Sequence, residues 1–445
     1  MTHIKKHILS TLNLAYPVII GQLGVIMMGV VDSLMVGKLG AIPLAAAALG
    51  NSLTFIVIII GMGLSMSVTP LVAIAVGAKR FEDCGIYFRQ SLLINFVFSI
   101  IITILIFFTA DLIKYLDQPL EVQVQAQAYM KIIGLSSIPL MLFQSYKQFI
   151  EGLSVMRPAM VITLLANIIN ALANWVLIFG KFGFPALALN GAGWATFSSR
   201  VFMAIVMMGF VMNKEFFKQF DVSFHFKSIN WKVIKKILSL GLPSGFQYFF
   251  EVGAFSFAVV MVGWLGPKPQ AAHQIAINLA SISFMAVLGI SVAGSIRVGI
   301  AVGQRDIQET RRAGFTASFL GASVMLFSGL IFIFFRNFLP SLYINDENVI
   351  SIASSLLVIA ALFQLSDGLQ AVGIGILRGL MDVKIPTAIT FIAYWVVGLP
   401  VGYLLGFTFN LGVQGVWIGL LSGLTTSAIL LTLRFNSRSK HIITV

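Results

Sequence analysis

Three acidic side chains, Asp32, Glu251 and Asp367, lie well inside long apolar stretches, whereas the other Asp and Glu residues lie in polar segments or at the ends of such stretches. If a helix begins near Leu242 in the apolar stretch 241–263, a rise of about 1.5 Å per residue places Glu251 roughly 13 Å from its start, near the centre of a hydrocarbon layer about 30 Å thick. A carboxylate at that depth is costly unless it is protonated, paired with a cation or facing water, so such acids are candidates for cation binding. The structural alternative for each acid is a hydrogen bond between helices.

Glu251 and Asp367 each have an aromatic residue one helical turn away. Gln247 and Phe255 lie four residues before and after Glu251, so all three share one face of a helix. Phe363 precedes Asp367 by four residues. Two carboxylates that converge in a low-dielectric site cannot both stay ionised without a cation, so the pair predicts a site that binds Na⁺ or shares a proton. Ring faces can add cation–π attraction, although ordinary helix packing explains the same residues equally well. The rings considered for such contacts are Phe255, Phe284 and Phe363.

The elements that must position these acids are twelve apolar segments separated by polar connections. The chain is 58% hydrophobic and only 10% charged, where soluble domains carry about 25% charged residues. Apolar segments of about twenty residues are typical of membrane helices, and they lack the alternating pattern of a membrane β-barrel. The sequence therefore predicts an all-α protein that crosses a lipid bilayer twelve times. The predicted spans are 14–36, 46–72, 91–110, 126–150, 159–180, 190–211, 239–264, 272–297, 314–335, 349–373, 386–407 and 413–433.

Cysteine, histidine and the net charge exclude several other classes of protein. The single cysteine, Cys84, rules out a disulfide framework within the chain, and only one of the five histidines, His273, lies within a predicted span, so the spans hold no histidine pair for a metal site. The net charge of +13 does not indicate nucleic-acid binding, because the basic residues are spread over many short loops between apolar segments. No cofactor is expected.

Basic residues are distributed unequally between the two sets of loops. Most Lys and Arg residues lie in the termini and in the loops on one side, which the positive-inside rule places in the cytoplasm. Lys147, Arg200 and Arg297 fall inside or at the ends of spans, and we expect them to extend toward the cytoplasmic interface. The prediction is a multi-pass plasma-membrane protein with both termini in the cytoplasm. The opposite loops contain Lys38, Lys114, Lys131, Lys181, Lys268 and Arg336.

The two halves of the chain repeat each other. One constant offset in residue number aligns Pro17 with Pro243, and it aligns 75–77 with 301–303, which both read Ala-Val-Gly. The match runs without a gap over about sixty residues and includes prolines and glycines, whose backbone roles are specific. Six spans in each half give both halves the same direction of insertion, so the repeat is parallel. The predicted domains are an N-terminal six-helix lobe at 1–212, a cytoplasmic linker at 213–236 and a C-terminal six-helix lobe at 237–445.

The repeat favours a transporter over an ion channel. Parallel six-helix repeats imply a pseudo-two-fold axis along the membrane normal and a central cavity that can open to either side in turn. A channel would need several copies or a filter loop of repeated carbonyls, for which the sequence offers no candidate. The acids do not follow the repeat, because Asp32 corresponds to Ala258 and Glu251 to Val25. We therefore expect the two halves to hold different sites.

Several motifs resemble those of the multidrug and toxic compound extrusion (MATE) family, and most closely its NorM-type bacterial branch. They are VDSLMVGKLG at 31–40, Glu251 in the seventh span, FQLSDGLQAV around Asp367 in the tenth, and GAGWAT at 191–196 in the sixth. The resemblance covers nearly the whole chain and implies a V-shaped pair of six-helix lobes. It also implies export of small organic cations, such as drugs and dyes, in exchange for inward Na⁺ or H⁺.

The resemblance implies roles for particular residues. The family's coupling acids fall on Glu251 and Asp367, which would hold Na⁺ in a sodium-coupled member, and on Asp32 in the N-terminal half. Asn170 and Asn174 lie where the family places polar partners of that N-terminal acid, and some branches have Asp at the position of Asn174. Together with the residues that flank Glu251 and Asp367, the predicted substrate-contacting or supporting residues are Asn170, Asn174, Gln247, Phe255, Phe284, Phe363 and Thr196.

Two other functions stay open at this point. The related flippases of lipid-linked oligosaccharides share the broad architecture, but a pyrophosphate-bearing substrate would need a cavity lined by Arg and Lys, which Arg200 and at most Arg297 could supply. A membrane enzyme would need a nucleophile–base pair or metal ligands at membrane depth, and the spans offer no His or Cys in such an arrangement. The expected protein is therefore a cation-coupled exporter of the bacterial inner membrane, a monomer and not an enzyme, with Na⁺ or H⁺ as coupling ion.

Overall fold

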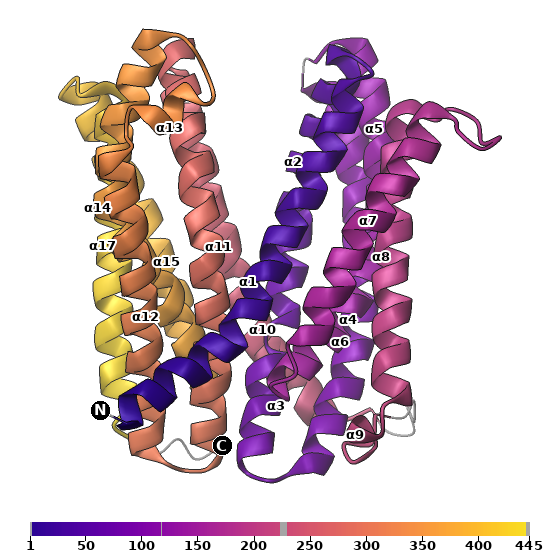
Figure 1. The fold of residues 1–445 in the computed structure, drawn as a ribbon, viewed down its shortest axis with the longest axis vertical. Coiled ribbons are helices and arrows are strands. Elements are labelled where there is room, and N and C mark those ends of the chain that lie inside the picture. Colours follow the sequence, from indigo (N-terminus) through magenta and orange to yellow (C-terminus); the bar gives the residue numbers. More distant parts are fainter. Residues whose placement is uncertain (1, 117, 223–228, 442–445) are drawn as a thin grey trace. The chain divides into compact units, whose positions relative to one another are not determined.

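The computed structural model describes residues 2–116, 118–222 and 229–441 (Figure 1). Within those residues every regular element is helical, and twelve helical stretches are long and apolar enough to cross a bilayer, which confirms the predicted class and number of spans. The helices are α1 (Thr2–Gly37), α2 (Ala41–Ser65), α3 (Val68–Gly77), α4 (Phe81–Leu112), α5 (Leu120–Leu135), α6 (Ser137–Gly152), α7 (Arg157–Phe179), α8 (Ala188–Asn213), α9 (Glu215–Lys218), α10 (Trp231–Gly263), α11 (Pro267–Gly303), α12 (Ile307–Phe334), α13 (Phe338–Ser341), α14 (Glu347–Gly379), α15 (Lys384–Phe391), α16 (Leu399–Tyr403) and α17 (Gly412–Arg438), with a 3₁₀ turn at Ile113–Tyr115 and π-helical segments at Ile392–Gly398 and Leu404–Thr408.

Local sequence signals mark where several helices begin. Asp306 caps α12, because its carboxylate accepts a hydrogen bond of 2.9 Å from the backbone N–H of Glu309. Asp346 caps α14 in the same way, and its carboxylate also forms an ion pair of 3.1 Å with Lys268. The hydrogen bond from Lys268 holds the pKa of Asp346 below its usual value. These polar residues therefore fix helix ends outside the apolar spans.

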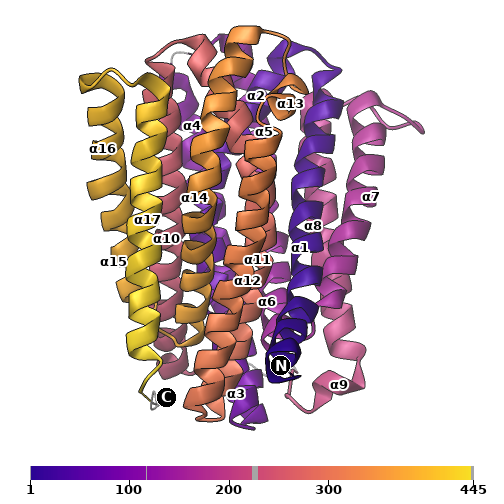
Figure 2. The ribbon, with the colours of Figure 1, turned by 60° about the vertical axis from the view of Figure 1, so that its left-hand side comes forward.

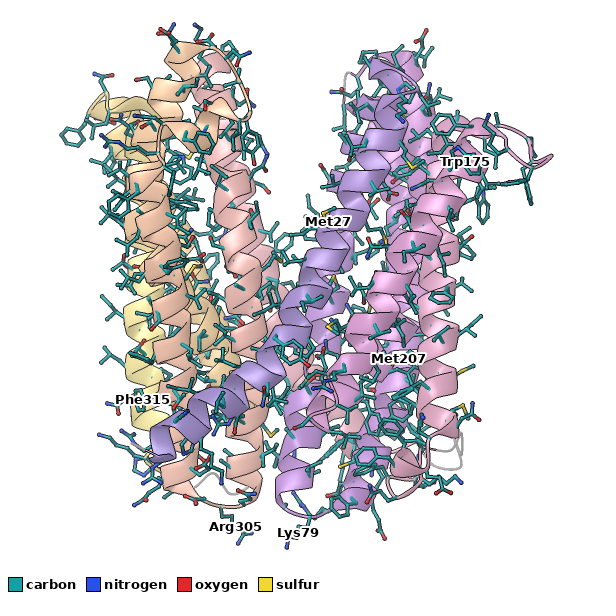
Figure 3. The ribbon with its side chains drawn as sticks, in the orientation of Figure 1. Met27, Lys79, Trp175, Met207, Arg305 and Phe315 are labelled. Carbon is teal, nitrogen blue, oxygen red and sulfur yellow. The ribbon has the colours of Figure 1, made fainter. Side chains whose placement is uncertain are left out.

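The helix boundaries repeat along the chain as predicted. The turn before α2 contains Gly40 with a φ of 115°, and its equivalent in the second half, Gly266, has a φ of 110° before α11, a backbone region open essentially to glycine. Lys79 and Arg305, which the same offset relates, have φ values of 57° and 59° in the turns after α3 and α11 (Figure 3). From the fourth span the difference in residue number between equivalent positions increases by one. The start of α14 shows this when it is compared with the start of α5, and the end of α14 shows it when compared with the end of α6. The repeat is thus present in the backbone.

The two halves differ in how continuous their helices are. In the first half the second span is divided between α2 and α3, and the fourth is divided between α5 and α6 at Ser136. The matching helices α11 and α14 of the second half run without a break. The second half has its irregularity in the eleventh span, where Ile392–Gly398 and Leu404–Thr408 are π-helical. Such π-helical turns are rare and often occur at functional sites.

Backbone contacts divide the chain into two compact units. Unit 1 contains Met1–Ile19 and Phe246–Val445, and unit 2 contains Ile20–Gly245. The division differs from the predicted lobe boundaries in two places, because the start of α1 belongs to unit 1 and the start of α10 belongs to unit 2. Both helices continue from one unit into the other without a break.

The two exchanged segments pack in the same way on equivalent helices. In unit 1 the backbone of α1 at Ala15 and Ile19 lies against Gly289 of α11, where an added Cβ would lie 2.9 Å from the Ala15 carbonyl oxygen. In unit 2 the backbone of α10 at Gly245 lies against Gly63 of α2, where an added Cβ would collide with the Gly245 backbone. The offset of the repeat relates Gly63 to Gly289, and it also relates Ile19 to Gly245. Small residues thus let each exchanged segment approach its partner helix closely.

The segment between the sixth and seventh spans also belongs to unit 2. Phe217, in the short helix α9, and Phe220 are buried in an aromatic cluster. Arg89 of α4 forms an ion pair of 2.7 Å with Asp221, which holds the segment on this unit. The middle of the predicted linker, 223–228, lies outside the described residues.

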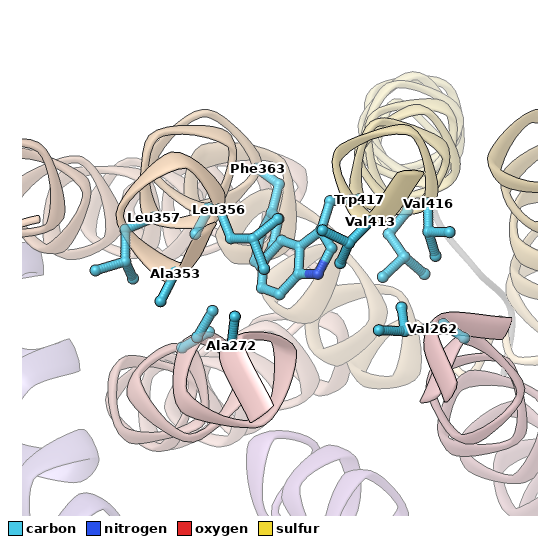
Figure 4. Packing of buried hydrophobic residues seen from close by; sticks show 14 of the residues in the cluster. Val262, Ala272, Ala353, Leu356, Leu357, Phe363, Val413, Val416 and Trp417 are labelled. Atoms are coloured by element: carbon cyan, nitrogen blue, oxygen red, sulfur yellow. The ribbon is translucent and has the colours of Figure 1, made fainter. Parts of the chain in front are cut away.

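Unit 1 has an aromatic core formed by α11, α14 and α17, in which α14 lies beside both of the other helices (Figures 1 and 2). Trp417 of α17 is fully buried, and its ring stacks on Phe363 of α14 at a centroid distance of 5.3 Å (Figure 4). Ala272 of α11 and Ala353 of α14 are fully buried in the same cluster, which leaves room for the two rings. Phe363, a predicted site residue, is therefore also a core residue.

Glycines bring the last two spans of unit 1 into backbone contact. An added Cβ at Gly419 would collide with the backbone of Gly402, because the two helices touch without side chains between them. The glycines recur every four residues on both helices and so form a continuous contact. On the eleventh span they are Gly398, Gly402 and Gly406, and on α17 they are Gly415, Gly419 and Gly423.

We expect Gly419→Ala to lower the Tm of the purified protein, at a cost of about 1–3 kcal/mol, because the added methyl group must push two helices apart. Gly29→Ala is the matched control, since Gly29 lies within α1 and an added Cβ there would meet nothing within 4 Å. Alanine at that position should keep or raise the Tm through its higher helix propensity. Equal effects of the two substitutions in a thermal melt would show that the Gly419 contact does not stabilise the fold.

Candidate functional site

Glu251 of α10 and Asp367 of α14 line one cavity inside unit 1. The cavity has a volume of about 400 Å³ and a mostly apolar wall. The two residues are only 7% and 6% exposed, so their carboxylates lie within the helix bundle. The structure thus brings together the two acids that the sequence predicts as a pair, although they come from helices that are far apart in the sequence.

A chain of hydrogen bonds holds Glu251. Gln370 of α14 donates from Nε2 to Glu251 Oε1 at 3.1 Å, and its own Oε1 accepts a hydrogen bond of 2.6 Å from the Tyr394 hydroxyl. Gln370 and Tyr394 are both fully buried. Tyr394 belongs to the π-helical segment of the eleventh span, and its neighbour Trp395 donates a hydrogen bond to the Phe250 carbonyl of α10. The irregular turn is therefore tied to α10 beside Glu251.

Asp367 has a different environment. Within the described part of the chain its carboxylate accepts no hydrogen bond, and no basic side chain forms an ion pair with it or with Glu251. The same residues contain no cluster of three or more His, Cys, Asp and Glu side chains that could hold a metal ion. The buried guanidinium of Arg378 attracts the Glu251 carboxylate electrostatically, but neither acid has an ion-pair partner among the described residues. The two acids face a single cavity, and this arrangement suits an exchangeable cation.

The predicted flanking residues take two different places. Phe255, Phe284 and Phe363 line the cavity together with the two acids. Gln247 does not line it, and its amide donates a hydrogen bond of 3.2 Å to Thr390 of α15. Three of the predicted aromatic residues therefore adjoin the acids, whereas Gln247 connects α10 to the eleventh span.

A histidine closes another part of the cavity wall. His273 of α11 is 1% exposed, and its Nδ1 accepts a hydrogen bond of 2.9 Å from the indole N–H of Trp417. Because Phe363 stacks on Trp417, the three side chains form one contact between α11, α14 and α17. This cluster connects the three helices beside Phe363.

Asp32 has a site of its own in unit 2. Asn174 of α7 donates to Asp32 Oδ1 at 2.5 Å, and Thr196 of α8 donates to Asp32 Oδ2 at 3.2 Å. Asn174 also donates to Asn170 Oδ1 at 3.1 Å, and both asparagines are fully buried. The three predicted partners of Asp32 thus surround it. The Asn170 Nδ2 and Asn174 Oδ1 atoms are buried without a hydrogen-bond partner among the described residues.

The three basic residues that we expected at the cytoplasmic interface occupy different depths. Lys147 lies one turn before the end of α6 and forms an ion pair of 3.8 Å with Glu151. Arg297 lies near the end of α11 and donates a hydrogen bond of 2.8 Å to Thr11 of α1. Arg200 is different, because it lies at the middle of α8. The expectation for Arg200 was wrong, since about 18 Å and 20 Å of helix separate it from the two ends of α8.

Sequence reasoning missed Gln370 and Tyr394. Gln370 follows Asp367 by three residues, so the spacing of a polar residue on the same helix face could have identified it. Tyr394 carries no comparable signal, because its position depends on a π-helical turn that an α-helical periodicity does not predict. The sequence signal for Tyr394 is limited to its hydroxyl group within the apolar span 386–407.

Known proteins are similar to this chain in sequence and in fold. The MatE family model matches residues 17–176 and 243–404. The probable multidrug resistance protein NorM of Mesorhizobium japonicum is 38% identical over 443 residues, which cover 98% of this chain and 95% of that protein. The multidrug resistance protein MdtK of Yersinia pseudotuberculosis is 37% identical over 437 residues, which cover 97% of this chain and 96% of that protein.

Solved structures show the same fold at lower identity. The crystal structure of the eukaryotic MATE transporter AtDTX14 has a TM-score of 0.88 at 22% identity and covers 98% of both chains. A MOP superfamily transporter from Pyrococcus furiosus has a TM-score of 0.87 at 21% identity and covers 98% of this chain and 96% of its own. Since the family model matches both halves and the relatives cover nearly the whole length, the chain belongs to the MATE family, as its motifs predicted.

Proposed function

We propose that this protein is a secondary active transporter that exports organic cations in exchange for inward Na⁺ or H⁺ by alternating access. The observation that carries the proposal is the cavity of about 400 Å³ in unit 1, which Glu251 and Asp367 line together, neither of them in an ion pair with a basic side chain among the described residues. Two NorM- and MdtK-type relatives named as multidrug resistance proteins support the same function. We place the protein in the bacterial inner membrane, as a monomer with both termini in the cytoplasm.

Glu251 and Asp367 would bind the coupling ion, which is a substrate of the transport cycle. Hydroxyl groups of Tyr248, Ser256 and Ser281 line the same cavity, and hard cations such as Na⁺ prefer oxygen ligands of this kind. A proton would bind to either carboxylate directly. The hydrogen bond from Gln370 keeps Glu251 Oε1 oriented in both cases, because an amide N–H can donate to a carboxylate or to a carboxylic acid.

The organic cation would pair with Asp32 in the N-terminal lobe, with Asn170, Asn174 and Thr196 as supporting groups. These side chains hold the Asp32 carboxylate in one orientation, and the two buried amide atoms without partners can hydrogen-bond a bound molecule. We propose residues 1–212 and 237–445 as the two functional lobes and 213–236 as the linker. The start of α1 then belongs to the first lobe but packs in unit 1, and the start of α10 belongs to the second lobe but packs in unit 2.

The alternative functions have less support. Among the described residues no Lys or Arg lines the unit 1 cavity, whereas a flippase of pyrophosphate-linked oligosaccharides would need such residues in its binding site. His273 lines this cavity but its Nδ1 is occupied by Trp417, and no Ser, Cys or Thr forms a hydrogen bond with it in the described structure. The arrangement therefore fits a binding site better than the nucleophile–base pair of an intramembrane enzyme.

The test is efflux of ethidium from vesicles that contain the purified protein, with Na⁺ and pH gradients imposed separately. We expect one of the two gradients, directed so that the ion moves opposite to the dye, to increase the efflux rate several-fold over vesicles without a gradient. Collapsing that gradient with the matching ionophore should return the rate to the baseline. If neither gradient changes the rate, cation exchange is not the function of this protein.

A further inference from the structure

Arg200 is a guanidinium group at the centre of a membrane span. It lies twelve residues after the start of α8 and thirteen before its end, about 18 and 20 Å of helix from the two ends. These distances exceed the reach of an arginine side chain, so its charge stays at depth. Its Nη1 donates a hydrogen bond of 2.7 Å to the Ser136 hydroxyl, at the break between α5 and α6. A single hydroxyl group does not balance a positive charge at this depth.

Asp32 is the group that can balance this charge. Thr196, which donates to Asp32 Oδ2 at 3.2 Å, lies one helical turn before Arg200 on the same face of α8. Asp32 and Arg200 form no direct ion pair in the described structure, but their charges attract each other, an effect on Asp32 that is weaker than the hydrogen bonds from Asn174 and Thr196. Arg200 is the one basic side chain of the described residues with such an effect on Asp32. The two charges therefore share one region of unit 2.

The internal repeat supports this association. In the second half, the residue equivalent to Asp32 is Ala258, so that half lacks the acid. Its α17, which is equivalent to α8, has no basic residue before Arg434, close to the end of the helix. The acid and the arginine thus occur together in one half and are both missing from the other. Such a pattern is expected if each charge at this depth requires the other.

We propose that Arg200 is the resident counter-cation of Asp32 and keeps this carboxylate ionised through the transport cycle. Arg200 is then a positioning residue, because it acts through Asp32 and through electrostatics, without contacting the coupling ion. The inference deepens the proposed function and rests on it in one respect: an acid that stays ionised can pair with an organic cation but carries no coupling proton. The coupling ions would then bind to Glu251 and Asp367 alone.

Thermal melts of the purified protein separate the charge of Arg200 from its hydrogen bond. Arg200→Gln removes the charge and can keep a hydrogen bond to Ser136, whereas Arg200→Lys keeps the charge, and Ser136→Ala removes the hydrogen bond alone. We expect Arg200→Gln and Asp32→Asn each to lower the Tm by about 5 °C or more, and the other two variants to lower it by about 2 °C or less. The double variant Asp32→Asn with Arg200→Gln should recover at least half of the larger single loss. A loss in Arg200→Lys as large as in Arg200→Gln, or additive losses in the double variant, would overturn the proposal.

Infrared spectroscopy tests the ionisation itself and needs no transport assay. At neutral pH, Arg200→Gln should gain a carbonyl band of a protonated carboxylic acid relative to the wild type, and this band should be missing from the double variant with Asp32→Asn. The Arg200→Lys spectrum should match that of the wild type. The proposal would be contradicted if wild type and Arg200→Gln showed the same carboxylic-acid band and if Asp32→Asn removed that band from both. Failure of ethidium exchange would count against the proposed function and leave these two measurements unaffected.

Discussion

Asp367→Asn is expected to abolish gradient-driven efflux of organic cations, with the rate falling to that of protein-free vesicles. The substitution keeps the size of the side chain and removes the charge that would bind Na⁺ or the proton. It should not impair folding, because Asp367 accepts no hydrogen bond among the described residues and a neutral amide costs less to bury than an uncompensated carboxylate. The variant should therefore reach the membrane in normal amounts and be inactive.

Lys384→Gln is the matched control for this experiment. Lys384 begins α15, is exposed and lies outside the cavity, so the loss of its charge should leave efflux within about twofold of the wild type. Efflux rates and the amount of inserted protein are to be measured in the same vesicles. Normal ion-driven efflux by Asp367→Asn would remove Asp367 from the coupling mechanism.

A membrane potential that is negative inside is expected to speed the efflux of a monovalent organic cation even when Na⁺ and pH are equal on both sides. One-for-one exchange with Na⁺ or H⁺ moves no net charge and would ignore the potential. Two carboxylates, Glu251 and Asp367, can together carry two monovalent cations, so each cycle would move one net positive charge inward. That charge adds about 2.3 kcal/mol per 100 mV, enough for a roughly fifty-fold drug gradient, whereas a tenfold gradient of one ion adds about 1.4 kcal/mol.

Valinomycin and K⁺ set this potential in reconstituted vesicles. The orientation of the protein should be fixed or determined, so that the direction of net charge movement can be assigned. A zero-potential sample with equal K⁺ on both sides is the baseline. Efflux that does not respond to the imposed potential would favour one-for-one exchange.

The acids of the C-terminal site could be predicted from the sequence because a charge inside an apolar helix is energetically costly and therefore conspicuous. The same argument located Asp32, and spacing by helical turns located Phe255 and Phe363. Gln370 and Tyr394 were missed because a neutral polar side chain costs less to bury, and because the hydrogen bond of Tyr394 depends on a π-helical turn.

The boundary between the two units could not be read from composition. Residues on both sides of Ile19 and of Gly245 are equally apolar, and a polar linker is the natural place to divide the chain. The division is set by where backbones approach closely, at Gly63 and Gly289, and close approach is a property of tertiary packing. Arg200 does not follow the rule that long basic side chains extend to the membrane interface, because it lies farther from both ends of α8 than its side chain can reach.

The exchange of helix ends has a consequence for the order in which the protein is made. Unit 2 is complete only after α10 has left the ribosome, because residues up to Gly245 supply part of its packing. Unit 1 uses α1, the first helix to be synthesised, and this segment must wait for α11 before it can pack against Gly289. The first six spans alone therefore leave one glycine-lined face uncovered and one helix end without a partner. Each unit therefore needs a helix segment from the other half of the chain, and unit 2 can complete its packing only after synthesis of the second half has begun.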